Sequence, residues 1–200
     1  HNLAKTLKEI SKVGNSGFYE GWVAEDIVSK LKSCGGNHTL KDFSSLSVEY
    51  VEPISTNYRG YDVYECPPNG QGIVALMILN ILEQFDLRSF EPDNFERVHL
   101  EAEATKIAFH HRNKYLGDPK FTDIPVEKLL CKDYARELSK KISFKELINE
   151  LHILPSENNK DTVYISVVDK ERNCVSFINS IFHPFGSGIV CPRSGVLLHN

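Results

Sequence analysis

The sequence predicts a mixed α+β fold in which a largely helical block precedes a β-rich block. Apolar residues recur at helical spacing through much of residues 1–151, whereas residues 162–200 alternate or form short β-branched runs. A polar segment, 155–160, lies between the blocks. Polar loops that contain proline are places where chains are cut or joined. These observations divide the chain at Thr162.

The composition is that of a globular protein and excludes several classes of function. Of the 200 residues, 41% are hydrophobic and 25% are charged, and the formal net charge is −4. A chain without a basic surface is not expected to bind nucleic acid. The longest apolar run, 73–82, is far shorter than the roughly 20 residues of a membrane helix. No signal-peptide pattern follows His1, so we expect a cytoplasmic protein, or a periplasmic or secreted one if a leader precedes His1.

Two short amphipathic helices are expected in the first 36 residues. Their apolar positions, three or four residues apart, are Leu3, Leu7 and Ile10, then Val23, Ile27 and Leu31. A turn at 14–17 separates the two helices. Gly35 and Gly36 can end the second helix by adopting positive φ.

Alternating residues at 47–51 and 61–65, with a turn at 57–60, predict a β-hairpin. An abrupt loop at 67–72 then leads into an apolar segment, 73–85, which we expect to be a buried helix.

Further helices follow in the second part of the helical block. Asn94 is a suitable cap for a helix over 95–115, which residues 117–119 end. Lysine-rich short helices between 126 and 151 are expected to form a solvated outer layer.

The β-rich block predicts a second hairpin. Residues 161–169 and 174–182 are the expected strands, and 171–173 the turn between them. A glycine loop at 185–188 and short strands at 189–190 and 196–198 follow.

Five scattered cysteines without C-x-x-C spacing predict free thiols in a reducing compartment. They are Cys34, Cys66, Cys131, Cys174 and Cys191. Most of them are expected to be buried, as free cysteines commonly are.

The junction Asp161-Thr162 is the first candidate site. A threonine hydroxyl is a weak nucleophile without a neighbouring base, but a threonine that begins a chain can use its own α-amine. That amine has a pKa of about 7.7–8.0, so part of it is neutral near pH 7. Cleavage between Asp161 and Thr162 would create this nucleophile. The alternative is a threonine that opens a strand because of its β-propensity.

Ser180 is the second candidate, because it lies on the return strand eighteen residues after Thr162. One interpretation is that its hydroxyl forms a hydrogen bond with Thr162 across the hairpin. The alternative is an ordinary strand serine whose hydroxyl bonds the backbone. Gly186, Ser187 and Gly188 allow close backbone approach or form a tight turn, and lack the spacing of a phosphate loop.

We expect no metal and no cofactor. His110 and His111 are adjacent, so they face different sides of a helix. The pair of His99 and Glu103, four residues apart, is consistent with a structural role.

Taken in order, these features resemble the γ-glutamyltranspeptidase family of N-terminal-nucleophile (Ntn) hydrolases. The resemblance covers nearly the whole chain and ends in the specific pair T-x-x-x-S-V-V-D and F-G-S-G. The segments that carry it are 17–21, 67–72, 79–83, 99–104, 115–119, 161–169, Asn173, 185–188 and 195–198.

The resemblance implies a four-layer αββα sandwich and a precursor that cuts itself before Thr162. Residues 1–161 would be the C-terminal part of the large subunit and 162–200 the start of the small one. Thr162 would be the nucleophile, with its new α-amine as base. Ser180 stands where the family has a threonine that bonds the nucleophile. The substrate would be glutathione or a related γ-glutamyl amide, and the two subunits would stay associated.

One position departs from the transpeptidases proper. They have an asparagine that contacts the substrate α-amino group where this sequence has Phe182, and an apolar ring cannot make that hydrogen bond. The 67–72 loop and Ile178-Asn179-Ser180 are more similar to a branch with oxamate amidohydrolases and cephalosporin acylases. The substrate-pocket candidates are therefore Asn179, Phe182, Gly186 and Ser187.

Three functions follow as hypotheses. The first is a γ-glutamyltransferase-like amide hydrolase or acyltransferase, and the second an amidase of oxamate or cephalosporin-acylase type. The third is a non-catalytic binding or structural relative. The family's oxyanion-hole glycines and carboxylate-binding residues fall outside residues 1–200, so we expect this piece alone to be an incomplete, inactive fragment.

Overall fold

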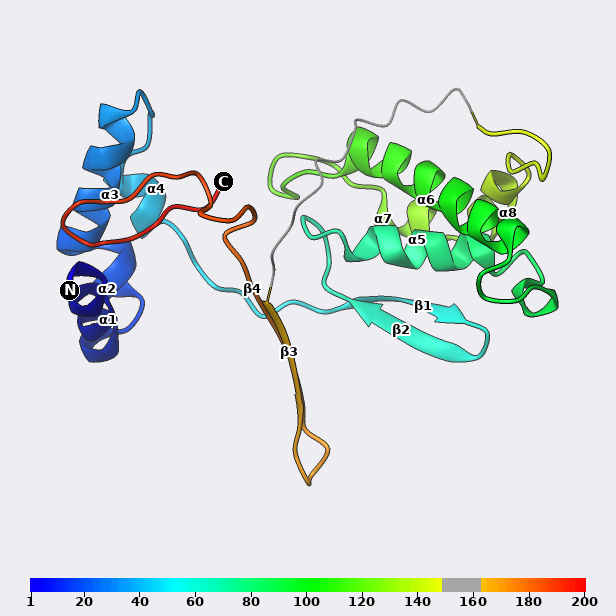
Figure 1. The fold of residues 1–200 in the computed structure, drawn as a ribbon, viewed down its shortest axis with the longest axis horizontal. Coiled ribbons are helices and arrows are strands. Elements are labelled where there is room, and N and C mark those ends of the chain that lie inside the picture. The colour runs from blue at the N-terminus through cyan, green and yellow to red at the C-terminus, as the bar shows by residue number, and fades with distance from the viewer. Residues whose placement is uncertain (149–162) are drawn as a thin grey trace. The chain divides into compact units, whose positions relative to one another are not determined.

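A computed structural model describes residues 1–148 and 163–200. Among these, residues 1–48 and 163–200 form one compact unit and residues 49–148 form a second. Helices and two separate two-stranded antiparallel sheets are both present, so the predicted α+β class is confirmed (Figure 1).

The first unit begins with the two predicted helices. Its helices are α1 (Asn2–Val13), α2 (Ser16–Tyr19), α3 (Gly21–Ser33) and α4 (Leu40–Ser44). The end of α3 is the predicted glycine cap, since Gly35 has φ 86°. The amide of Gly35 donates to Lys32 O (3.0 Å) and that of Gly36 to Leu31 O (2.9 Å), which satisfies carbonyls that the helix leaves open.

The face of α1 that is buried differs from the predicted one. Leu3 and Leu7 are 49% and 58% exposed, whereas Thr6 is 1% exposed. The Thr6 hydroxyl donates to the carbonyl oxygen of Ser194 (2.9 Å). A distant polar contact, and not the apolar stripe, therefore decides how this helix packs.

The second predicted hairpin is confirmed as β3 (Val163–Val168) and β4 (Cys174–Asn179). The return strand ends at Asn179 and not at Phe182, so the prediction that Ser180 lies on this strand is wrong. The antiparallel register runs from Val163 opposite Asn179 to Val168 opposite Cys174. Asn173 closes the turn by donating its amide N–H and its Nδ2 to Asp169 (both 2.8 Å). These two bonds hold the pKa of the Asp169 carboxyl below its usual value.

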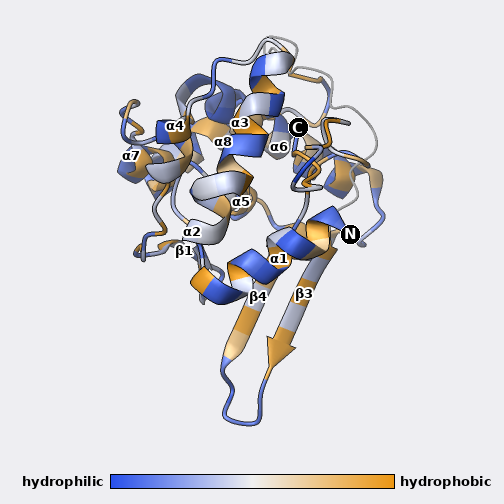
Figure 2. Cartoon of the chain, turned by 90° about the vertical axis from the view of Figure 1, so that its left-hand side faces the viewer, coloured by the Kyte–Doolittle hydropathy of each residue, from blue (hydrophilic) through white to orange (hydrophobic). Residues whose placement is uncertain are grey.

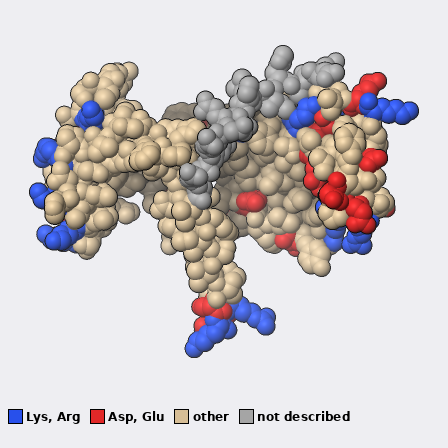
Figure 3. Space-filling model, in the orientation of Figure 1, with Lys and Arg blue, Asp and Glu red and all other residues tan. Residues whose placement is uncertain are grey.

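Both strands of this hairpin are exposed along their whole length. They carry many apolar side chains, including Val163, Val168 and Ile178 (Figure 2). Charged residues gather instead at its turn, where Lys170 pairs with Glu171 at 3.3 Å (Figure 3). Strands that are apolar on both faces are typical of sheets covered on both sides.

Residues 181–200 form a loop that folds back on itself. The predicted short strands at 189–190 and 196–198 reduce to one bridge between Val190 and Leu197. Gly186 has φ 50°, and a Cβ there would clash with the carbonyl oxygen of Leu198. Only glycine fits this close approach.

The second unit places a hairpin and helices around one core. Its elements are β1 (Ile54–Tyr58), β2 (Tyr61–Glu65), α5 (Gly72–Leu82), a 3-10 turn (Leu87–Ser89), α6 (Phe95–Tyr115), α7 (Val126–Leu130) and α8 (Lys132–Ser139). The cap of α6 is as predicted, because Asn94 Oδ1 accepts from Glu96 N (2.8 Å) and Arg97 N (3.4 Å).

The prediction of a strand at 47–51 is wrong. The first strand is 54–58, which pairs with the correctly predicted 61–65 through the two-residue turn Arg59-Gly60. A tight turn requires the residues next to it to pair. Residues 47–51 are instead exposed and without strand structure.

The buried helix predicted at 73–85 is confirmed, with its end at Leu82. Ile73, Leu76 and Ile81 are each at most 1% exposed. The expected outer layer is wrong for the apolar face of α7 and α8, because Leu129 and Leu138 are 4% and 3% exposed and join this core. The lysines of these short helices indicate only their exposed face and not the apolar face that packs on the core.

A polar network crosses the core of this unit at Asn80, which has no exposed surface. Asn80 Oδ1 accepts from Thr56 Oγ1 (2.6 Å) and Lys132 Nζ (2.7 Å), while Asn80 Nδ2 donates to Leu130 O (3.0 Å). Lys132 also bonds Glu83, whose pKa is lowered by hydrogen bonds from Lys132 and the Arg59 amide, against desolvation. The network ties α5 to the hairpin and to α8.

His111 on α6 is buried and bonded through both ring nitrogens. Because a carbonyl only accepts, Nδ1 donates to Ile107 O (2.8 Å), and in the neutral ring Nε2 accepts from the Tyr134 hydroxyl (2.8 Å). Burial lowers the pKa of His111, against the opposing effect of the bond to Ile107.

This arrangement predicts that acid destabilises the second unit through His111. An unfolded histidine takes up a proton near pH 6.5, and the folded one only below that. The contribution of neutral His111 to the free energy of unfolding is therefore complete above pH about 6.5. It is lost as the pH falls toward the lowered pKa of His111 in the folded protein. In the full-length protein, the urea midpoint should fall between pH 7.5 and 5.5 by less in His111→Gln than in wild type. His110→Gln is the control, and equal falls in wild type and His111→Gln would contradict the assignment.

Candidate active site

The predicted nucleophile and cleavage bond, Thr162 and Asp161, lie outside the described residues. The other predicted site residues lie close together in sequence and structure at the end of β4 and in the loop after it. Asn179 is the last residue of β4, Ser180 follows it, and Phe182, Gly186 and Ser187 are in the loop.

Ser180 is half-buried at the point where the β3–β4 pairing ends. Its Oγ accepts a hydrogen bond from the amide of Phe182 (2.9 Å). This bond shapes the backbone after β4 and fixes where the hydroxyl oxygen lies. The last described pair of the hairpin, Val163 with Asn179, is one step away from Ser180.

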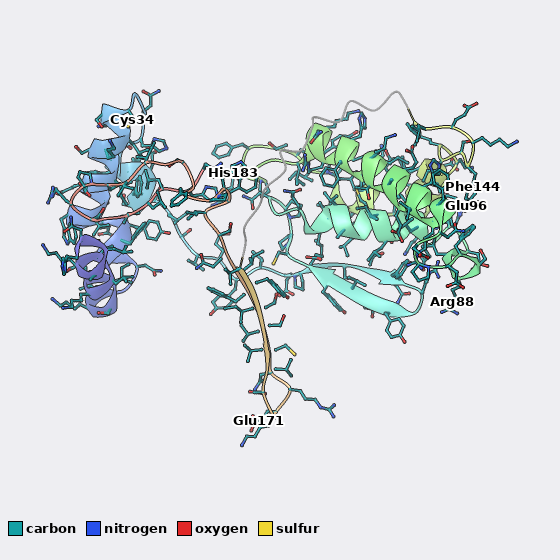
Figure 4. The ribbon with its side chains drawn as sticks, viewed as in Figure 1. Cys34, Arg88, Glu96, Phe144, Glu171 and His183 are labelled. Carbon is teal, nitrogen blue, oxygen red and sulfur yellow. The ribbon has the colours of Figure 1, made fainter. Side chains whose placement is uncertain are left out.

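Phe182 has φ 75°, in the left-handed region that bulky side chains avoid. Its ring is 40% exposed and lies 5.0 Å from the His183 ring and 6.5 Å from the His199 ring, measured between centroids. Figure 4 shows His183 on the segment that leads away from β4. The position therefore carries an apolar ring on a backbone that asparagine would adopt more readily.

Ser187 has its hydroxyl engaged in the loop. Both its amide N and its Oγ donate to Leu198 O (2.9 Å each), and Oγ accepts from Ile189 N (3.3 Å). The hydroxyl hydrogen is used within the loop, so Ser187 stabilises the shape of the loop and is not arranged as a nucleophile.

The cysteines depart from the expectation of burial. All five are free, but only Cys191 is buried, and the other four are exposed. Figure 4 labels Cys34 after the end of α3. Burial, and next the charge of Asp26, raise the pKa of the Cys191 thiol. Cys191 is therefore a core thiol and not an activated one.

Residues 1–148 and 163–200 contain no group of three or more His, Cys, Asp or Glu side chains that could hold a metal ion. His99 donates from Nε2 to Ser143 O (2.7 Å), and Glu103 pairs with Lys106 (2.8 Å). His99 and Glu103, which are four residues apart on the same helix, thus have separate structural partners. No helix in the described part of the chain is long and apolar enough to span a membrane.

The second unit brings two of the sequence motifs together. Pro67 and Pro68 of the 67–72 loop and the segment 119–126 line an open cavity of about 640 Å³. Beside it, Arg112 Nη1 donates to Gln71 Oε1 (2.9 Å). Residues at least 41 positions apart therefore form one surface, which periodicity alone does not indicate.

Comparison with known proteins identifies the relatives of this arrangement. The sequence model of the family described as Gamma-glutamyltranspeptidase matches residues 1–200. A glutathione hydrolase-like proenzyme of Bacillus subtilis is 42% identical over 99% of this chain and 37% of its own length. The glutathione hydrolase proenzyme of Escherichia coli is 38% identical over 100% of this chain and 35% of its length.

Other relatives carry different names. The oxamate amidohydrolase proenzyme of Klebsiella pneumoniae is 32% identical over 99% of this chain and 37% of its length. The crystal structure of cephalosporin acylase from Bacillus halodurans is 38% identical, with a TM-score of 0.82 over 99% of this chain and 35% of that one. The predicted resemblance and its Ntn-hydrolase fold are confirmed, and the chain spans little more than a third of the relatives' length. The chain belongs to the γ-glutamyltranspeptidase family.

Proposed function

We propose that the full-length protein is a glutathione hydrolase-type amide hydrolase or acyltransferase that cuts its own chain between Asp161 and Thr162. The register of the β3–β4 hairpin is the observation that carries this proposal. Val163 lies opposite Asn179. Thr162 precedes Val163 and Ser180 follows Asn179 in the sequence, so both candidates adjoin the same end of this hairpin.

The first step of the proposed chemistry converts the precursor. The Thr162 hydroxyl attacks the carbonyl carbon of Asp161, the C–N bond breaks, and an ester to the threonine oxygen forms. Water then hydrolyses the ester, which leaves a carboxylate on Asp161 and a free α-amine on Thr162. Before this step that nitrogen is an amide and cannot act as a base.

The second step is turnover of an amide substrate. The Thr162 hydroxyl oxygen attacks the substrate carbonyl carbon while the α-amine takes up the hydroxyl proton. The α-amine then returns a proton to the leaving amine. Water or an acceptor amine then releases the acyl group. The Ser180 hydroxyl would hold the nucleophile's oxygen in position. The two chains produced by cleavage would remain together as one enzyme, with a γ-glutamyl compound as substrate.

Mass spectrometry and N-terminal sequencing of the purified full-length protein test the cleavage. The expected result is two chains, the smaller one beginning at Thr162, with hydrolysis of γ-glutamyl-p-nitroanilide. A single inactive chain would contradict the proposal and would favour a non-catalytic relative.

Phe182 favours a second candidate, an amidase of oxamate or cephalosporin-acylase type. An apolar ring at this place offers no partner to a substrate α-amino group, and relatives with these two names match the chain. Parallel assays of the full-length enzyme on γ-glutamyl-p-nitroanilide, oxamate and a cephalosporin separate the two. Higher kcat/KM on either of the latter would select the amidase.

Replacing Phe182 by Asn should move specificity toward γ-glutamyl amides. The amide side chain supplies an acceptor for the substrate ammonium, and hydrogen bonds to charged groups contribute about 1.5–3 kcal/mol. The expected change is an increase of about tenfold in the ratio of kcat/KM for γ-glutamyl-p-nitroanilide to that for oxamate. Phe182→Leu is the control that removes the ring without adding an acceptor. Equal ratios in both variants would show that position 182 does not read the α-amino group.

A further inference from the structure

The turn formed by residues 191–195 is the most firmly held part of the loop after β4. Within the turn, Cys191 N donates to Val196 O (2.8 Å) and Gly195 N donates to Cys191 O (2.9 Å). Gly195 has φ 70°, and a Cβ there would lie 2.6 Å from the amide nitrogen of Leu3. The turn therefore lies directly against the start of α1.

Asp26 on α3 holds two backbone groups of this turn. Its Oδ2 accepts from Ser194 N at 2.7 Å and from Arg193 N at 3.1 Å. Asp26 is only 3% exposed. A buried carboxylate needs such donors, because without them its desolvation is costly.

Helix α1 holds two more backbone groups. Thr6 Oγ1 donates to Ser194 O (2.9 Å), and Asn2 Nδ2 donates to Pro192 O (2.8 Å). We call these three side chains, Asn2, Thr6 and Asp26, the clasp. They bind only main-chain atoms of the turn, so they recognise its shape.

An apolar core lies beneath the clasp and is shared by the same two segments. One buried cluster contains Val23 and Ile27 from α3, Cys191 from the turn and Val196 directly after it, and Cys191 and Val23 have 0% exposure. The clasp thus closes a small core to which both segments contribute.

The clasp joins residues that are 167–190 positions apart in sequence. All of its side chains precede the proposed cleavage point, and the turn follows it. We propose that the clasp is the tie that keeps the two chains together once the Asp161–Thr162 bond is cut. This inference rests on the proposed self-cleavage. No covalent link would then connect the turn to α1 and α3.

The clasp also anchors the loop that carries Gly186 and Ser187, two of the substrate-pocket candidates. The loop returns from the turn to the pocket residues through Leu198, whose carbonyl accepts both bonds from Ser187 and whose amide donates to Ile189 O (3.0 Å). His183 N donates to Asn200 Oδ1 (3.0 Å) on the same returning strand of the loop.

The test uses the full-length protein in a form that can be cut at will. Thr162→Ala blocks self-cleavage, and a specific protease site replaces residues 157–160. Asp26→Ala, Asp26→Asn and the control Glu25→Ala, an exposed neighbour on α3, are made in this background. Association of the two chains is measured before and after cutting by gel filtration over a dilution series.

We expect every uncut protein to remain a single folded chain. After cutting, Asp26→Ala should raise the dissociation constant of the two chains at least about tenfold, since two hydrogen bonds to a charged acceptor are lost. Asp26→Asn, which keeps an acceptor oxygen, should raise it less, and Glu25→Ala should leave it unchanged.

Two results would overturn the clasp. One is a cut Asp26→Ala protein that stays associated over the same dilution range as the cut parent. The other is an uncut Asp26→Ala protein that has already lost its fold, which would make Asp26 a general stability residue. Because the protease makes the cut, these outcomes are independent of self-cleavage, which the intact Thr162 protein reports separately.

Discussion

We expect Thr162→Ala to leave the full-length protein as one uncut chain without amidase activity. The alanine side chain has no hydroxyl to attack the Asp161 carbonyl, so no α-amine is released. The same change removes the nucleophile of turnover. Removal of an enzyme's nucleophile costs about 10⁴-fold or more in kcat. Denaturing gels and hydrolysis of γ-glutamyl-p-nitroanilide measure the two effects separately.

Thr162→Ser is the matched variant, because it keeps a hydroxyl and loses only a methyl group. It should still be cut, and its small chain should begin at residue 162. An uncut Thr162→Ala protein with wild-type activity would refute the assignment of Thr162. A cut Thr162→Ala protein would place the cleavage chemistry elsewhere in the chain.

The largest stability loss in the second unit is expected for Asn80→Ala. The substitution removes an acceptor from Thr56 and Lys132 and a donor from Leu130 O. Asn80 itself has no exposed surface. Buried polar groups that lose partners cost about 1–3 kcal/mol each. Because Lys132 keeps its bond to Glu83, we expect a total loss of about 2–4 kcal/mol, measured by urea unfolding of the full-length protein.

Gln84→Ala is the control for this prediction. Gln84 is half-buried and makes one long bond, from Nε2 to Asn80 O at 3.3 Å. Its removal should cost less than about 1 kcal/mol. A loss for Asn80→Ala as small as that of the control would show that solvent or a shifted Lys132 replaces the missing amide.

Short-range sequence patterns predict the structure correctly where an element depends only on residues close to it in the sequence. The cap at Asn94, the glycine end of α3 and the hairpin over 163–179 each follow from residues within a few positions of one another. The prediction of a strand at 47–51 is wrong because alternation within one segment does not supply the neighbouring strand with which it must pair. The two-residue turn at Arg59-Gly60 assigns that partner to residues 54–58.

The candidate site divides in the same way. The order of motifs in the sequence was sufficient to identify the family and to propose Thr162 and Ser180 as the reacting pair. It gave no sign that Asp26, an acidic residue in an amphipathic helix, is buried, or that Thr6 replaces Leu3 and Leu7 on the packed face of α1. Their partners are backbone groups of the 191–195 turn, far away in sequence.

The sequence by itself determined the α+β class, most of the helices, the second hairpin and the membership of the γ-glutamyltranspeptidase family. Only the tertiary structure decided which polar residues are buried, where the first hairpin begins, and that the two ends of this chain share one core. The physical reason is range. Periodicity, capping and turns act over a few residues, whereas burial of a polar side chain is stable only when a distant group supplies its hydrogen bond.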